Sequence, residues 1–304
     1  MPARNEAERL DRLLDALADQ DIEGPIRVVL ALNNTTDRSA QIAAQAGLRH
    51  GDRLSLLIDD HVFAPDLAHA GSARQRAMAL GSGLLGQDRA GVLISTDADT
   101  RPPPDWVRRN LEAVDGGADL VGGRLAWDEA EAVSPPIRHA RALWDEYWTR
   151  VRAIEDELDP SACDPAPRHG DHTGASLAIT IDAYSTAGGV PLIPSGEDRA
   201  LVAAAVGAGR RLAHPLNVWT RVSPRLDGRA VGGMAEDMRR LQAEAVEGRH
   251  PTAPDFAHWR ARALWRRDLR ARLGPAAMLA AEAALPPMPH DMVLRRSAAP
   301  GDAS

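Results

Sequence analysis

The sequence predicts an α/β fold, in which a mixed and mostly parallel sheet carries helices on both faces, followed by a C-terminal helical extension. Over the first two thirds of the chain, short continuous apolar runs alternate with segments of helical periodicity. Continuous apolar runs are typical of parallel strands that are buried on both faces. From residue 234 onward the pattern is helical, and prolines interrupt it.

The first expected element is a helix that opens at Glu6, because Asn5 and Glu8 form a capping pair and leucines then recur at helical spacing. The second helix is expected to stop at Gly47. Strands are expected over residues 26–32, 54–58, 91–95, 120–127 and 176–180, with two short extended pieces within 211–222. Helices are expected over residues 38–46, 71–85, 103–114, 138–158 and 198–208.

Three segments are expected along the chain: an α/β domain over residues 1–233, a helical extension over 234–290 and a disordered tail over 291–304. A parallel sheet of this type normally has a strand directly before a segment such as residues 2–6, where only Met1 stands. Either the true start lies upstream or the first strand is missing, and both would weaken the edge of a ligand pocket.

The composition excludes several classes of protein. The net charge of -7 argues against sequence-independent binding to nucleic acid, because such binding needs a basic surface. All 36 basic residues are arginines, and the absence of lysine excludes a Schiff-base enzyme and a P-loop NTPase. The single Cys163 excludes an internal disulfide and a thiolate metal cluster. Small molecules or proteins are therefore the expected partners.

The sequence favours a cytoplasmic location, because no apolar run approaches the roughly 20 residues of a spanning helix and no signal peptide precedes the first helix. The basic stretch 259–272 places Trp265 and Leu269 among arginines. A solvated helix face is the preferred interpretation, and peripheral contact with a membrane surface is the alternative. Oligomeric state is not encoded in any recognisable pattern.

An acidic turn follows the strand expected over residues 91–95. Its carboxylates, Asp97 and Asp99, stand at the carboxyl end of that strand, which is where open parallel sheets bind ligands. Two carboxylates on one side of a turn can hold Mg²⁺ or Mn²⁺ while phosphates fill the remaining positions. A solvated turn is the alternative interpretation of this short pattern.

Four ordered segments resemble glycosyltransferase family 2, namely Pro2–Glu6, Leu32–Asp37, Ser95–Asp99 and Gly196–Asp198. Their order and spacing both match, and the resemblance covers about residues 2–232. It implies a Rossmann-like GT-A fold and a bacterial-type, metal-dependent, inverting enzyme. Such an enzyme moves a sugar from a nucleoside diphosphate to a hydroxyl acceptor, which the sequence does not identify.

The resemblance also implies how the donor is held. Pro2, Ala3, Glu6 and Asp37 would line the pocket of the nucleobase and ribose. Asn33 departs from the family pattern, because many relatives have an aspartate there that accepts a hydrogen bond from uracil. An amide both donates and accepts, so the choice between UDP-linked and GDP-linked donors stays open.

Arginines are expected at the donor diphosphate, where a guanidinium fork suits phosphate oxygens. Arg74 lies in a segment that resembles the family's basic segment, whereas an exposed helix face explains Arg76 equally well. Arg225 and Arg229 lie in a glycine-containing loop, which would close over the diphosphate. Surface arginines in a turn are the alternative for this pair.

Catalysis is expected to depend on a second acidic pair, Glu197 and Asp198, which opens a helix where the dipole favours negative charge. In the family the aspartate deprotonates the acceptor hydroxyl, so Asp198 would be the base and Glu197 would position the acceptor or the base. An acidic helix cap is the alternative. His214 is expected either as a third metal ligand beside Asp97 and Asp99 or as a structural histidine.

Two other functions are alternatives to glycosyl transfer. A degenerate, non-catalytic module would bind a nucleotide sugar or a protein, and a nucleotidylyltransferase would normally need a glycine-rich loop and a lysine. The segment Gly81–Gly86 matches the dinucleotide-binding glycine pattern, but it closes an expected helix and precedes a strand. That context is the reverse of what dinucleotide binding requires.

Overall fold

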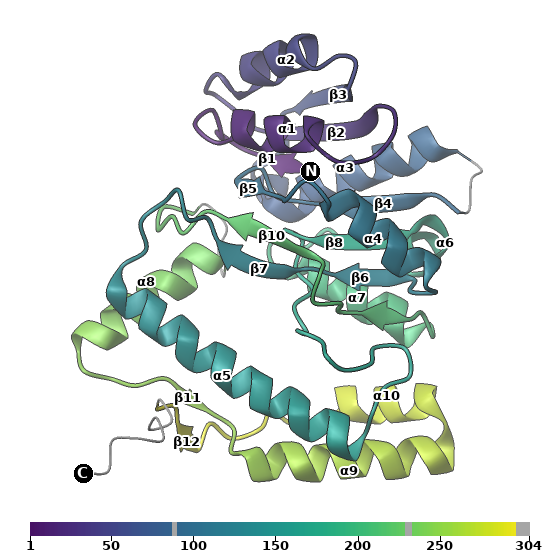
Figure 1. Ribbon diagram of the computed structural model, residues 1–304, viewed down its shortest axis with the longest axis vertical. Helices are drawn as coiled ribbons and strands as arrows, with labels where there is room; N and C mark the ends of the chain where they lie inside the picture. Colours follow the sequence, from purple (N-terminus) through teal and green to yellow (C-terminus); the bar gives the residue numbers. More distant parts are fainter. Residues whose placement is uncertain (87–89, 229–232, 296–304) are drawn as a thin grey trace. The chain divides into compact units, whose positions relative to one another are not determined.

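The computed structural model describes residues 1–86, 90–228 and 233–295 (Figure 1). Its contacts divide the chain into two compact units. Among the described residues, the first unit holds 1–131 and 163–224, and the second holds 132–162, 225–228 and 233–295. This division differs from the boundary expected at residue 233, because helix α5 (Pro135–Leu158) packs with the C-terminal helices.

The first sheet of the first unit is parallel, with the order β1-β2-β3. Its strands are β1 (Pro2–Ala3), β2 (Ile26–Asn33) and β3 (Leu54–His61). The first strand is therefore present as two residues, which pair with Ala31 and Leu32 of β2. β2 is buried from Val28 to its end, as its continuous apolar run predicts.

Helices α1 (Leu10–Ala18) and α2 (Ser39–Arg49) pack against each other beside this sheet (Figure 1). The prediction that α1 opens at Glu6 behind an Asn5 cap is wrong. Asn5 instead adopts a φ of 52°. Its Oδ1 accepts a hydrogen bond from the backbone N–H of Thr36, so it does not cap the helix that follows it. α2 also continues through Gly47, because its buried alanines pack against the core and outweigh the weak helix propensity of glycine.

The second sheet of the first unit is mixed, with the order β4-β8-β6-β9. Its strands are β4 (Val92–Ser95), β8 (Leu177–Thr180), β6 (Leu120–Gly122) and β9 (Leu212–Ala213). β8 runs antiparallel to both of its neighbours, and β6 pairs with β9 in parallel. β4 ends directly before the acidic turn of Asp97 and Asp99, as the sequence predicts.

The strand expected over residues 120–127 is two strands in different sheets. β6 ends at Gly122, and β7 (Arg124–Trp127) pairs with β10 (Trp219–Val222), which also pairs with β5 (Thr100–Arg101). The break has a packing cause, because a Cβ on Gly123 would lie 2.0 Å from Ser176 Oγ. The chain thus bends where only glycine allows the close approach.

Four further α-helices of the first unit are described. They are α3 (Ala70–Leu85), α4 (Trp106–Asp115), α6 (Ile181–Thr186) and α7 (Glu197–Gly207), and a short 3₁₀ turn η1 (Pro65–Leu67) precedes α3. α3 packs against β1, β2 and β4, so it links the two sheets. α3 ends at Leu85, and Gly86 caps it with a φ of 63°, which confirms that the Gly81–Gly86 pattern closes a helix.

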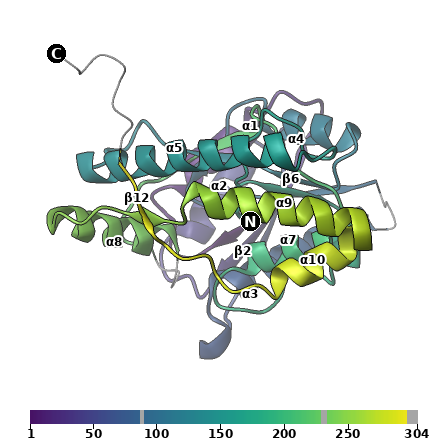
Figure 2. The same cartoon turned by 90° about the horizontal axis from the view of Figure 1, so that it is seen from below.

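The second unit consists of helices and one short antiparallel pair of strands. It contains α5, α8 (Met234–Val246), α9 (Phe256–Leu273), α10 (Pro275–Ala283), β11 (Thr252–Ala253) and β12 (Met292–Val293). α5 and α9 lie side by side (Figure 2). One core contains Leu143, Tyr147 and Val151 of α5 with Ala253 and Leu294, and Phe256 and Trp259 of α9 pack against it. β12 lies in the expected tail, of which residues 296–304 lie outside the described residues.

The basic stretch on α9 takes part in packing within the second unit. Arg266 pairs with Glu155 at 2.6 Å, and Arg270 makes two hydrogen bonds of 2.6 and 2.8 Å to Asp159. Arg266 therefore connects α9 to α5, and Arg270 connects α9 to the residue that directly follows α5. No helix within the described ranges is long and apolar enough to cross a membrane.

Candidate functional site

The loops that follow β1 and β2 are tied together by side-chain hydrogen bonds. Asn5 Oδ1 accepts from the backbone N–H of Thr36 at 2.8 Å, and Asp37 Oδ2 accepts from that of Ala7 at 3.0 Å. Ser39 completes the link, since its Oγ accepts from Glu6 N at 2.8 Å and donates to Asp37 Oδ1 at 2.6 Å. The structure thus links the Glu6 backbone to the Asp37 carboxylate through Ser39, and the wall of a nucleoside pocket at these residues stays a prediction.

Asn33 lies at the carboxyl end of β2, and its side-chain oxygen receives no hydrogen bond from the described residues. Its side-chain N–H donates to the backbone oxygen of His69 at 2.7 Å, which fixes the orientation of the amide. Asn33 is only 2% exposed, and its Oδ1 has no hydrogen-bond partner among the described residues. A buried acceptor without a partner costs free energy, so a ligand N–H at this position would be stabilised.

The acidic turn after β4 has a fixed backbone. The carbonyl oxygen of Asp97 accepts from Thr100 Oγ1 at 2.9 Å, and Thr100 Oγ1 also lies 2.7 Å from Thr96 Oγ1. The carbonyl oxygen of Asp99 accepts from Ser223 N, just beyond β10, at 3.2 Å. The Asp97 side chain is 37% exposed. The turn therefore presents acidic side chains from a rigid frame.

Arg74, on α3, joins this turn to the second acidic pair. Its guanidinium donates to Asp97 Oδ1 at 2.7 Å, to Glu197 Oε1 at 2.9 Å, to Ser95 Oγ at 2.6 Å and to the carbonyl oxygen of Gly174 at 2.9 Å. The side chain is only 6% exposed. Burial lowers the pKa of Arg74, but the carboxylates of Asp97 and Glu197 outweigh it and hold the pKa above its usual value.

These contacts change the interpretation of Arg74. The sequence predicts a guanidinium that faces the donor diphosphate, whereas the structure turns it inward onto protein acceptors. Arg76, two residues along α3, instead forms a more exposed ion pair with Asp59, with Nη2 2.8 Å from Oδ1. A pattern of two nearby arginines does not reveal which of them is buried, because that depends on partners distant in sequence.

The second acidic pair begins α7, and its two side chains diverge. Gly196 precedes it with a φ of 75°, a conformation that favours glycine. Glu197 is 5% exposed and binds Arg74, whereas Asp198 is half-buried. Asp198 Oδ2 accepts from Gly174 N at 2.6 Å, and its Oδ1 accepts from Arg199 N at 2.7 Å. The pair is thus oriented by backbone and guanidinium donors.

Gly174 and Ser95 are site residues that sequence reasoning missed. A Cβ on Gly174 would lie 2.2 Å from the Cζ of Arg74, so a larger residue would displace the guanidinium. Ser95 Oγ donates to the carbonyl oxygen of Gly174 at 3.0 Å, which connects the end of β4 to the same network. A single glycine before a strand carries no local signal for this role.

His214 has protein partners on both ring nitrogens. Nδ1 lies 2.8 Å from Asp164 Oδ2, and Nε2 lies 3.1 Å from His172 Nδ1. Within the described ranges, no group of three or more His, Cys, Asp or Glu side chains is placed to hold a metal ion. The geometry therefore favours the structural alternative for His214. Arg225 falls in the second unit, and Arg229 lies outside the described residues.

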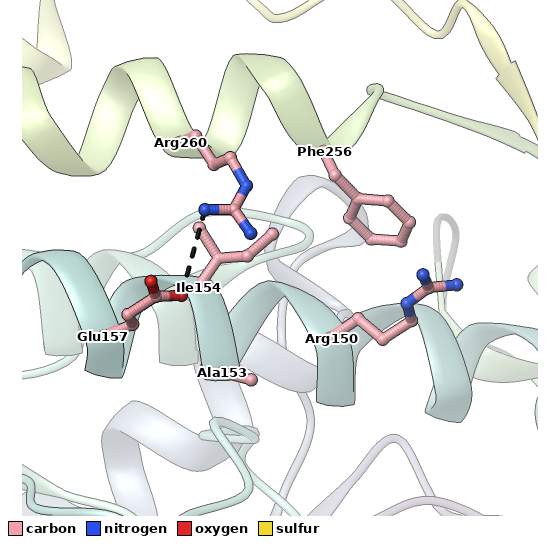
Figure 3. Close-up of a pocket in the computed structure, with 6 residues that line it drawn as sticks. All are labelled: Arg150, Ala153, Ile154, Glu157, Phe256 and Arg260. Carbon is pink, nitrogen blue, oxygen red and sulfur yellow. Dashed lines mark ion pairs between the residues drawn. The ribbon is translucent and has the colours of Figure 1, made fainter.

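A hollow of about 250 Å³ lies elsewhere, entirely within the second unit (Figure 3). It lies between α5 and α9 and is lined by Arg150, Ala153, Ile154, Glu157, Phe256 and Arg260. The Arg150 guanidinium lies 4.7 Å from the centre of the Phe256 ring, and Arg260 pairs with Glu157 at 3.8 Å. None of the predicted site residues lines this hollow.

The fold is that of the GT-A class. The chain resembles the crystal structure of TarS from S. aureus with a TM-score of 0.50 and 14% identity, over 88% of this chain and 42% of that chain. The family model described as Glycosyl transferase family 2 matches residues 1–163, more than half of the chain. The chain belongs to this family.

Two curated relatives match a shorter segment. Over 127 residues the chain is 28% identical to Glycosyltransferase AglE of Haloferax volcanii, covering 41% of this chain and 38% of the relative. Over 124 residues it is 31% identical to the undecaprenyl-phosphate 4-deoxy-4-formamido-L-arabinose transferase of Edwardsiella ictaluri, covering 40% of this chain and 34% of the relative. Each match therefore spans less than half of the relative's length.

Proposed function

We propose that this protein transfers a sugar from a nucleoside-diphosphate sugar to a hydroxyl acceptor, with inversion at the anomeric carbon. The observation that carries the proposal is the buried network in which Arg74 and Gly174 join Asp97 to Glu197 and Asp198. The network places the two acidic motifs beside each other, as a transfer that uses both a metal site and a base requires. The names of both curated relatives, a glycosyltransferase and an arabinose transferase, support the proposal.

Asp97 and Asp99 are the residues that would hold Mg²⁺ or Mn²⁺. Such ions bind through one or two carboxylates and complete their shell with water and substrate phosphates, so the acidic turn fits without a third protein ligand. When bound, the ion would neutralise charge on the leaving diphosphate. Pro2, Ala3 and the wall formed by Glu6 and Asp37 would hold the nucleoside, and Arg225 and Arg229 stay predicted diphosphate contacts.

Asp198 would remove the proton from the acceptor hydroxyl as that oxygen attacks the anomeric carbon. The bond from this carbon to the diphosphate oxygen breaks on the opposite face, which inverts the configuration. Two backbone N–H groups orient the Asp198 carboxylate before substrate arrives. Glu197, which is paired with Arg74, fixes the first turn of α7 and with it the direction of the base.

Metal-dependent binding of a nucleoside diphosphate is the first test. We expect UDP or GDP with Mn²⁺, at about 100 times its Kd, to raise the Tm by roughly 5–10 °C, because a ligand that binds only the native state stabilises it. EDTA or Asp99→Ala should abolish the rise. Asp52→Ala, at an exposed turn of the same unit, should not. No rise with UDP, GDP, CDP or dTDP would contradict the proposed donor site.

Asn33 should set the choice of base. Its buried Oδ1 accepts, and uracil and guanine both present a ring N–H, whereas the matching ring nitrogen of cytosine is an acceptor. We expect UDP or GDP to bind more tightly than CDP, and Asn33→Leu to weaken that binding about tenfold by calorimetry. Asn110→Leu is the control, since Asn110 on α4 is also buried, also donates to a backbone oxygen and also has an Oδ1 without a partner among the described residues. Preferential binding of CDP would exclude this role.

A further inference from the structure

A chain of buried polar side chains runs behind the segment that carries Gly174. Asp164 accepts two hydrogen bonds from His214, one from the backbone N–H at 2.7 Å and one from Nδ1 at 2.8 Å. His214 Nε2 then lies 3.1 Å from His172 Nδ1. His214 is 6% exposed and Asp164 is 8% exposed. The three side chains therefore form a continuous hydrogen-bonded series that is closed to solvent at its first two members.

The Asp164 carboxylate fixes which atom donates and which accepts in each hydrogen bond of the series. Burial raises the pKa of Asp164, but the hydrogen bonds from His214 outweigh burial and hold the pKa below its usual value. The ionised Asp164 therefore accepts from the Nδ1–H of His214. In a neutral His214 the Nε2 must then accept, so His172 donates through its Nδ1–H. One carboxylate thus selects the tautomers of two rings.

The two histidines pack closely against the end of β6 on one side. A Cβ on Gly122, at the end of β6, would lie 2.2 Å from the carbonyl oxygen of Asp171, 2.8 Å from His214 Cδ2 and 3.0 Å from His172 Cβ. The rings and the adjacent backbone therefore lie directly on the end of the sheet. The position of His172 is determined by the strand beneath it and by its bond to His214.

His172 precedes Gly174 by two residues, and Gly174 is the point where the acidic motifs meet. The Gly174 N–H donates to Asp198 Oδ2 at 2.6 Å, and its carbonyl oxygen accepts from Arg74 at 2.9 Å. The carbonyl oxygen of the next residue, Ala175, accepts from Thr96 Oγ1 at 3.0 Å. A displacement of the backbone at His172 would consequently move the donor that orients Asp198.

We propose that His172 is a positioning residue for Asp198, and that Asp164 and His214 hold it in place. The inference rests on the proposed function, because it gives the series a role in the transfer step. His172 acts through the backbone of Gly174 and not by contact with the donor. Its loss should therefore affect turnover more than donor binding, since misplacement of a catalytic group by about 1 Å can reduce the rate about 100-fold.

The test is a comparison of His172→Ala with His172→Asn. We expect His172→Ala to lower kcat by about 10- to 100-fold with the donor KM within about threefold of wild type. His172→Asn should recover most of the loss, because its side-chain N–H can take the place of Nδ1–H toward His214. His50→Ala is the matched control, since His50 is also hydrogen-bonded to an aspartate, Asp15, at 2.7 Å, but at the surface.

An asparagine variant no better than the alanine variant would overturn the proposal, and so would a donor KM that rises in proportion to the loss of kcat. Asp164→Asn keeps the side-chain volume and tests the other end of the series if His172→Ala does not fold. It should lower kcat similarly, and an unchanged kcat would also count against the proposal. The proposed function fails separately, if wild-type protein shows no donor-dependent transfer.

Discussion

Asp198→Asn is expected to lower turnover by about 10³-fold while the donor binds within about twofold of its wild-type affinity. The amide cannot take the proton of the acceptor hydroxyl, and loss of a general base typically costs about 10²- to 10⁴-fold. Its oxygen can still accept one of the two backbone N–H groups that now bind Asp198, so the start of α7 should persist. Single-turnover transfer and calorimetry with the donor diphosphate measure the two quantities.

The control for this variant is another carboxylate in the first turn of a helix. Asp182 occupies that position on α6 and forms a surface ion pair with Arg210. Asp182→Asn should leave turnover unchanged, which separates catalysis from the general effect of an acidic helix start. Full turnover in Asp198→Asn would show that Asp198 is only a helix cap and that another group takes the proton of the acceptor.

Arg74→Met is expected to lower the free energy of unfolding by about 3–5 kcal/mol, the usual cost of removing one partner from a buried ion pair. Glu197 is 5% exposed, so the substitution leaves a buried carboxylate without its guanidinium. Denaturant titration measures the change. Turnover should fall as well, because Asp97 and Gly174 lose the donor that fixes their relative positions.

Arg76→Met provides the matched comparison on the same helix. The pair between Arg76 and Asp59 is more exposed, with 38% of the arginine side chain accessible, so its loss should cost less than about 1 kcal/mol. The double variant of Arg74→Met with Glu197→Gln should be less destabilised than the sum of the single variants, since both remove the same interaction. Equal costs for Arg74→Met and Arg76→Met would contradict the buried network.

The sequence by itself determined the fold class and the position of both acidic motifs. Continuous apolar runs placed β2, β3 and β4 within a few residues. The run is explained most directly in β2, which is buried on both faces from Val28 onward and therefore needs apolar side chains throughout. The same logic placed Asp97 and Asp99 at the end of β4 and Glu197 and Asp198 at the start of α7. Each of these features is local, so a window of about ten residues contains its cause.

Only the tertiary structure decided which partner each polar side chain takes. Asn5 bonds to the loop of Thr36 in place of capping its own helix, and Arg74 turns inward to Asp97 and Glu197. His214 binds Asp164 and His172, and α5 packs with the C-terminal helices. These outcomes depend on groups that are distant in sequence. A buried donor must find some acceptor, but its own neighbourhood does not specify which one.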